Sequence, residues 1–229
     1  MDLTVDNSMN PVPLQCVLGS RSPRRLELLQ KIVPAESILV LPPRSTEESG
    51  FEDLHEVSAI QKRMQDIARS KCEDVLNQLR EREEERDDSV IPVVITADTT
   101  IIVTEKDGRL SVLGQPPDDR NWQEVVKYWF REYYAGKTHR AVTALCVATQ
   151  TGRLIERVAT SEVTFHSHVD HRLDWYLETG EPSGKAGGYA IQGAGSIFVS
   201  RVAGSLSNVI GLPLEELMEI FEELEIING

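Results

Sequence analysis

The sequence lacks a long apolar run, and this absence limits where the chain can work. None of its apolar stretches approaches the roughly 20 residues that a helix needs to cross a bilayer. The first 13 residues, MDLTVDNSMNPVP, have neither the basic end nor the apolar core of a secretory signal. We therefore expect a cytoplasmic protein with no membrane partner, and we interpret residues 1–13 as a disordered tail.

Cysteine and positive charge are also scarce. The three cysteines are odd in number, lie far apart and lack the spacing of a zinc site, so we expect reduced, buried thiols. Lysine and arginine number 24 against 37 Asp and Glu, which gives a net charge of −13. Such a chain is a poor general binder of nucleic acids, so we expect no nucleic-acid partner. Any polyphosphate ligand must be held by locally concentrated cations, and a divalent cation on the ligand would offset the repulsion.

Short strand patterns alternate with longer helical patterns from residue 14 onward, which predicts an α/β fold in a single domain over 14–229. The stretch near 72–90 carries dense charge of both signs, so we expect it to extend a helix into solvent or to form a mobile insertion. The expected strands cover 14–18, 37–40, 91–97, 100–103, 110–113, 139–149, 154–165 and 196–200, and the expected helices cover 23–32, 53–85, 119–134, 169–179 and 213–224.

The stretch LGSRSPRRLELL, residues 18–29, joins an apolar strand to an amphipathic helix. Gly19 permits a sharp turn, Ser20 and Ser22 can cap amides, and Pro23 suits the first helical position. Turn and helix formation do not explain the arginines of this stretch, because cations at a helix N-terminus oppose the helix dipole unless an anion lies between them. A phosphate held by backbone amides and arginine side chains supplies that reason. An ordinary capped helix with solvated arginines is the alternative.

Asp98 lies in the middle of the apolar run VVITADTTIIV, residues 93–103. Burial without a partner would raise the pKa of its carboxyl group, whereas a metal ion or nearby cations would keep it ionised and useful as a ligand or base. A structural aspartate held by backbone amides at a turn between two strands is the alternative.

The stretch TGEPSGKAGGYAIQGAG, residues 179–195, is dense in glycine and contains Lys185 and Gln192. It is not a Walker loop, because three residues rather than four separate Gly180 from Gly184 and alanine follows the lysine. We interpret it as a loop whose backbone can approach a ligand closely, with a charge at Lys185 and an amide at Gln192. A plain flexible turn explains the glycines almost as well.

The stretch FHSHVDHRL, residues 165–173, has the HxHxDH pattern of zinc hydrolases of the metallo-β-lactamase type. Those sites need further histidines downstream, and His171 is the last of five. We therefore favour a strand-to-helix junction capped by Asp170 over a zinc site.

Seven motifs, taken in chain order, resemble the Maf (septum-formation-inhibitor-like) family. They are LGSRSPRRLELL, QK at 61–62, ADT at 97–99, LGQP at 113–116, GKTH at 136–139, GEP with KAGGYAIQG within 180–193, and NVIGLPL at 208–214. The resemblance implies an elongated mixed sheet flanked by helices, with two lobes around a central cleft, similar to inosine triphosphate pyrophosphatases. It also implies a homodimer that hydrolyses a nucleoside triphosphate to the monophosphate and pyrophosphate, with Mg²⁺ or Mn²⁺ as cofactor.

The resemblance also assigns roles to individual residues. It implies that Asp98, Lys62 and Glu47 are catalytic, with Asp98 as proton acceptor and with Asp98 and Glu47 as metal ligands. The residues that it implies for substrate binding are Ser20, Arg24, Arg25, Thr99, Gln115, Lys185 and Gln192.

Three of these positions separate branches of the family. This chain has Arg24, Thr99 and Gln192 there, and in this it resembles the branch that acts on dTTP and UTP. Modified pyrimidine nucleotides are substrates consistent with the same assignment. The branch that acts on 7-methyl-GTP carries Trp, Gln and Glu there.

Two positions depart from the family's usual pattern. Gln115 stands where lysine is usual, which removes a charge that would assist the phosphates. Lys137 stands where arginine is usual, which keeps the charge without bidentate geometry. A nucleotide-binding regulator with weak or no hydrolysis is therefore the second function that the sequence supports.

Overall fold

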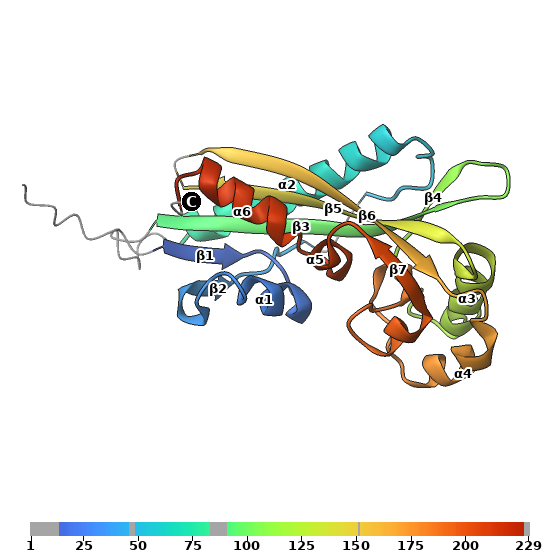
Figure 1. Ribbon diagram of the computed structural model, residues 1–229. Coiled ribbons are helices and arrows are strands. Elements are labelled where there is room, and N and C mark those ends of the chain that lie inside the picture. The colour runs from blue at the N-terminus through green and yellow to red at the C-terminus, as the bar shows by residue number, and fades with distance from the viewer. Residues whose placement is uncertain (1–13, 46–48, 83–90, 151, 227–229) are drawn as a thin grey trace, which may run out of the picture.

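The computed structural model describes residues 14–45, 49–82, 91–150 and 152–226, in which a seven-stranded mixed sheet forms the centre (Figure 1). β1 pairs in parallel with β2 and β3, and the remaining pairs are antiparallel. The strand order is β2-β1-β3-β5-β6-β7, with β4 paired to β3. The strands are β1 (Leu14–Leu18), β2 (Ile38–Val40), β3 (Ile91–Thr104), β4 (Leu110–Leu113), β5 (Thr138–Thr149), β6 (Leu154–Phe165) and β7 (Val199–Ala203).

Helices cover both faces of the sheet. Because side chains alternate along a strand, Cys16 and Leu18 of β1 join the core beneath α1 and α6, whereas Val17 joins the core beneath α2. Apart from Gln15, β1 is therefore apolar on both faces, as its largely hydrophobic sequence indicates. The helices are α1 (Pro23–Leu29), α2 (Val57–Arg80), α3 (Trp122–Trp129), α4 (Asp170–Glu178), α5 (Leu206–Ile210) and α6 (Leu214–Glu223).

A separate aromatic core holds α3 and α4 at the far end of the long strands (Figure 1). The ring of Phe130, in the π-helical turn that continues α3, has its centroid 5.1 Å from that of Phe198 and 5.6 Å from that of Phe165. Such edge-to-face contacts stabilise the packing beyond the burial of area. β3, β5 and β6 run through both ends of the molecule. They therefore fix the lobe that contains α3 and α4 relative to the lobe that contains α1 and α6. The predicted mixed sheet flanked by helices is confirmed.

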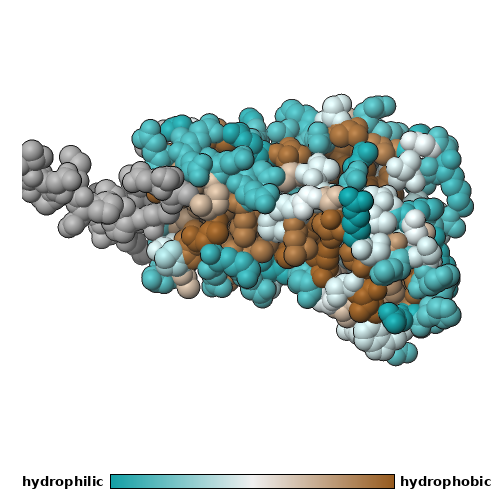
Figure 2. Space-filling model, in the orientation of Figure 1, coloured by the Kyte–Doolittle hydropathy of each residue, from teal (hydrophilic) through white to brown (hydrophobic). Residues whose placement is uncertain are grey.

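Polar residues cover most of the face that carries α6 and β7, and hydrophobic residues show around α5, where Leu206 is 52 % exposed (Figure 2). Across the described ranges no helix is long and apolar enough to cross a membrane. All three cysteines are unpaired and buried, as predicted.

The predicted elements and the structure differ at three places. β3 is continuous from 91 to 104 rather than two strands, and β7 covers 199–203 because a 3-10 turn takes up 194–198. The short helix α5 was not predicted; its five residues are too few for a periodic pattern.

The charged stretch near 72–90 extends a helix over its first part, as predicted, but this part does not extend into solvent. Residues 72–80 complete α2, and Cys72, Val75 and Leu79 are buried against the sheet rather than extending into solvent. Exposed charged residues lie between these positions, so the composition of the stretch does not reveal its apolar face. Residues 83–90 lie outside the described ranges.

Burial of His139 makes the stability of the fold depend on pH. Desolvation lowers the pKa of its imidazole from 6.5 to about 3, and Nε2 lies 2.8 Å from the Tyr189 hydroxyl. Below about pH 6.5 the unfolded chain therefore binds a proton here that the folded chain does not, so stability falls as the pH drops from 6.5 toward 3. We expect His139→Gln to reduce the pH slope of the free energy of unfolding by up to about 1.4 kcal/mol per pH unit in this window. Urea denaturation at pH 7 and pH 5 measures the slope, and identical slopes in both proteins would contradict the prediction.

Candidate active site

A cleft of ≈ 830 Å³ lies where the N-terminus of α1, the middle of β3 and the glycine-rich loop 179–195 meet. The structure brings together here all seven of the residues predicted to bind substrate, and Asp98, predicted to be catalytic, lines the same cleft. Those that line the cleft are Ser20, Arg24, Arg25, Thr99, Gln115, Lys185 and Gln192.

Arg25 fixes the turn that precedes α1. Its guanidinium donates to the carbonyl oxygens of Gly211 and Ala97, each at 2.8 Å. It also donates to Thr99 Oγ1 at 3.0 Å and to Ser20 Oγ at 3.4 Å. Arg25 therefore joins α1 to β3 and to the end of α5, and Thr99 helps to hold it.

The residues at the start of α1 are arranged differently from the prediction. Pro23 is at the first helical position as expected, but Ser22 makes no side-chain cap and Ser20 Oγ accepts from the Ser22 amide at 3.1 Å. Gly19 is required by close packing, because a Cβ there would lie 2.5 Å from Thr96 Cγ2.

Arg24 and Lys185 bring two cations to the cleft from opposite lobes. Burial lowers the pKa of both side chains, and the positive charge of Arg24 lowers the pKa of Lys185 further. Over the described part of the chain, no hydrogen bond is found to the Arg24 guanidinium, whereas Lys185 Nζ donates to the Ser183 carbonyl at 3.0 Å. An anion between the two cations would relieve their repulsion, so this part of the cleft suits a phosphate.

Asp98 forms an ion pair that the sequence did not predict. Even-numbered residues of β3 face α2. Thr96 donates to the Ala68 carbonyl at 2.7 Å. Asp98, two residues further along β3, accepts from Lys71 Nζ at 2.9 Å. The Asp98 and Lys71 side chains are only 10 % and 19 % exposed. Asp98 lies opposite Ala144 within continuous strands, so a turn between two strands does not explain it. The arrangement places a carboxylate and an ammonium together on the cleft wall.

Lys62 does not reach the cleft. It is exposed and forms an ion pair with Asp66. Lys62 and Lys71 are nine residues apart on α2, which is two and a half turns, so their side chains leave opposite sides of the helix. Lys71 therefore occupies the position in the cleft that we predicted for Lys62. Glu47 lies outside the described residues.

The histidine-rich stretch does not form a metal site in the structure. In the described ranges no three His, Cys, Asp or Glu side chains lie close enough to hold a metal ion. The cap predicted at this junction is wrong, however: Val169 is the N-cap of α4, and Asp170 accepts from Arg131 Nε at 2.8 Å. The helix begins at Asp170 itself, one residue earlier than a cap at this position requires.

The donors in the cleft fit a magnesium or manganese ion that arrives with a polyphosphate. Asp98 is the acidic residue among those described that line the cleft. Mg²⁺ is commonly held by one or two carboxylates together with substrate phosphates. One carboxylate facing a phosphate site meets that pattern.

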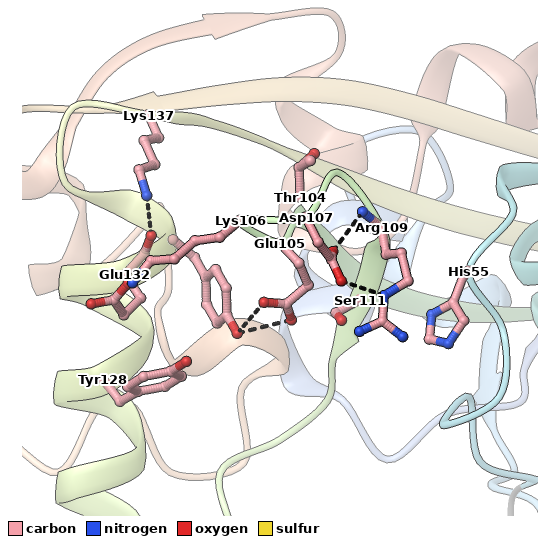
Figure 3. Close-up of a pocket in the computed structure, with 11 residues that line it drawn as sticks. His55, Thr104, Glu105, Lys106, Asp107, Arg109, Ser111, Tyr128, Glu132 and Lys137 are labelled. Atoms are coloured by element: carbon pink, nitrogen blue, oxygen red, sulfur yellow. Dashed lines mark hydrogen bonds and ion pairs between the residues drawn. The ribbon is translucent and has the colours of Figure 1, made fainter.

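A second pocket, of ≈ 480 Å³, lies between the β3–β4 hairpin and α3 (Figure 3). Its charges neutralise one another: Arg109 pairs with Asp107 and Lys106 with Glu132, each at 2.6 Å. Lys137 is found here, with Nζ donating to the Glu132 carbonyl, so its departure from the family's arginine does not affect the cleft (Figure 3). The described lining of the cleft carries several cations and one carboxylate, so the cleft is the better phosphate site.

A family model described as "Maf-like protein" matches residues 15–224. This chain belongs to the Maf family. The match covers the turn before α1, Asp98 and the glycine-rich loop, which are the parts that form the cleft.

Curated Maf relatives extend the match over nearly the full chain. A "dTTP/UTP pyrophosphatase" of Chelativorans sp. is 34% identical over 208 residues, covering 91% of this chain and 90% of the relative. Another of that name from Pyrococcus horikoshii is 34% identical and covers 90% of this chain and 95% of the relative. A solved nucleoside-triphosphatase / dITP/XTP pyrophosphatase from Mycobacterium abscessus covers 93% of this chain and 95% of that one, with 12% identity. Its TM-score of 0.38 is too low to bear on fold or function.

Proposed function

We propose that this Maf protein hydrolyses dTTP and UTP, and modified pyrimidine nucleotides of the same shape, to the monophosphate and pyrophosphate. The observation that carries the proposal is the cleft that sets the Asp98–Lys71 pair beside the cations Arg24 and Lys185. The relatives named above support the choice of nucleotide. We further propose that the protein is a homodimer, as is expected from the resemblance, and that it is cytoplasmic, as is expected from the sequence.

The residues divide the reaction between them. Arg24 and Lys185 bind the triphosphate, and Arg25 holds the turn at which the phosphates lie. Asp98 accepts a proton from the water that attacks the α-phosphorus, while Lys71 orients the carboxylate and offsets its charge. The new bond joins the water oxygen to the α-phosphorus. The bond between the α-phosphorus and the oxygen that bridges it to the β-phosphorus breaks, and pyrophosphate leaves with that oxygen. A bound Mg²⁺ or Mn²⁺, held by Asp98 and the phosphates, would neutralise negative charge.

The test is to incubate the purified protein with each common and modified nucleoside triphosphate, with Mg²⁺, Mn²⁺ or Zn²⁺, and to measure pyrophosphate. We expect release from dTTP and UTP with Mg²⁺ or Mn²⁺, and its loss when EDTA removes the metal. Tight nucleotide binding without release would support the second candidate, a nucleotide-binding regulator. Gln115 favours that candidate, because it lines the cleft where the family usually has a lysine.

Base choice is tested by Gln192→Glu. An amide that donates and accepts can pair with the carbonyl and N–H edge of uracil or thymine, whereas a carboxylate repels the carbonyl. We expect kcat/KM for dTTP and UTP to fall by about 10-fold or more, with a smaller loss for 7-methyl-GTP, whose base is positively charged and rich in donors. Steady-state kinetics with the three nucleotides measures the effect. An equal change for all three would mean that Gln192 supports the loop and does not contact the base.

A further inference from the structure

Glu181 connects α4 to the loop that lines the cleft. The chain turns at Gly180, whose φ is +70°, and brings the Glu181 carboxylate back against the backbone further along. This carboxylate accepts from the amides of Ala194 at 2.7 Å and Gly195 at 2.8 Å, and from the Tyr176 hydroxyl at 3.0 Å. Three hydrogen bonds to one charged group fix this part of the loop firmly.

The backbone that Glu181 holds is next to Gln192. Gly193 separates Gln192 from Ala194, and a Cβ at Gly193 would lie 2.1 Å from Glu181 Oε2. The carboxylate therefore packs directly on the backbone beside the amide that lines the cleft. Losing its hydrogen bonds would let that amide shift.

The same carboxylate acts on the phosphate side of the cleft through its charge. Burial lowers the pKa of Arg24 and of Lys185, and the negative charge of Glu181 raises the pKa of both. A fixed negative charge near two cations also weakens their attraction for an incoming anion. Glu181 therefore has two separable effects on a ligand, one on the base side and one on the phosphate side.

We propose that Glu181 is a positioning residue that makes the cleft select a nucleoside triphosphate over a polyphosphate without a base. Its hydrogen bonds hold Gln192 where the base lies, and its charge reduces the pull of Arg24 and Lys185 on a bare polyphosphate. This inference rests on the proposed function and adds to it a residue that contacts neither the base nor the phosphates.

Glu181→Gln separates the two effects. The variant keeps the size of the side chain but turns an NH₂ group toward backbone N–H donors and removes the negative charge. We expect the Kd for α,β-methylene-UTP, which resists cleavage, to rise about 10-fold, as for loss of a charge-assisted hydrogen bond. We expect the Kd for inorganic tripolyphosphate to fall about twofold to fivefold, because the cations lose a partly screened negative neighbour. Isothermal titration calorimetry with Mg²⁺ measures both values, and thermal melting checks that the variant is folded.

Two further variants complete the test. Glu178→Gln makes the same change of charge at an exposed position three residues earlier, and we expect neither Kd to change. Glu181→Asp keeps the charge on a shorter side chain, so the UTP analogue should bind more weakly while tripolyphosphate binding is unchanged. If the Kd values of both ligands change in the same direction when Glu181 is substituted, or if neither Kd changes, the proposal is overturned. A wild-type protein that binds no UTP analogue and releases no pyrophosphate overturns the proposed function instead.

Discussion

Asp98→Asn should lower kcat for pyrophosphate release from dTTP and UTP by about 10²-fold or more, the scale expected when a general base is removed. The substitution nearly preserves the shape of the side chain, which is 10 % exposed and accepts from Lys71 at 2.9 Å. The amide oxygen still accepts that hydrogen bond, but the group no longer takes a proton from water or attracts a metal ion. Since Arg24 and Lys185 are unchanged, the Kd for α,β-methylene-UTP should stay within about threefold of the wild-type value. Single-turnover kinetics and calorimetry measure the two quantities.

Asp66→Asn is the matched control for this substitution. Asp66 is exposed on α2, pairs with Lys62 and is not among the residues that line the cleft, so turnover should be unchanged. Near-normal turnover by a folded Asp98→Asn protein would show that Asp98 is not the base. Equal losses in the two variants would point to a general effect of removing a negative charge.

The turn before α1 could be predicted because its signals are local. The apolar residues before Gly19, then Gly19 and Pro23, and the leucines that follow specify a strand, a turn and a helix within residues 14–29, and the structure has them in that order. The role of Arg25 could not be seen locally, because its partners Ala97 and Gly211 are distant in the sequence. The family's motif order places those segments in one site, which no periodicity in the chain reveals.

The structure of α2 shows why Lys71 was missed. The helix was expected from its periodicity, but that pattern does not say which residue meets which position of β3. The contact follows from the register that places Ala68 opposite Thr96 and hence Lys71 opposite Asp98. A polar residue in an apolar strand is visible in a sequence, whereas its partner on another element depends on tertiary packing.

Lys71→Met should lower kcat/KM for dTTP and UTP by about 10²-fold, the scale seen when a preorganised electrostatic contact is removed from an active site. The Lys71 ammonium donates to Asp98 within the cleft, so its loss removes both a positive charge from the cleft and the group that orients the carboxylate. Removing one member of a largely buried pair also costs stability, so thermal melting should show a lower Tm. Lys71→Arg keeps the charge and should recover part of the lost activity, which a purely structural role would not require.

Lys62→Met distinguishes the two lysines of α2. This substitution removes the same charge from the same helix, but on its opposite side, where Lys62 is exposed and paired with Asp66. We expect kcat/KM to stay within about twofold of the wild-type value, because an exposed ion pair contributes little. A large loss in Lys62→Met with normal turnover in Lys71→Met would restore the assignment made from the QK motif at 61–62. The opposite result would establish that helix register, and not motif position, decides which lysine serves the cleft.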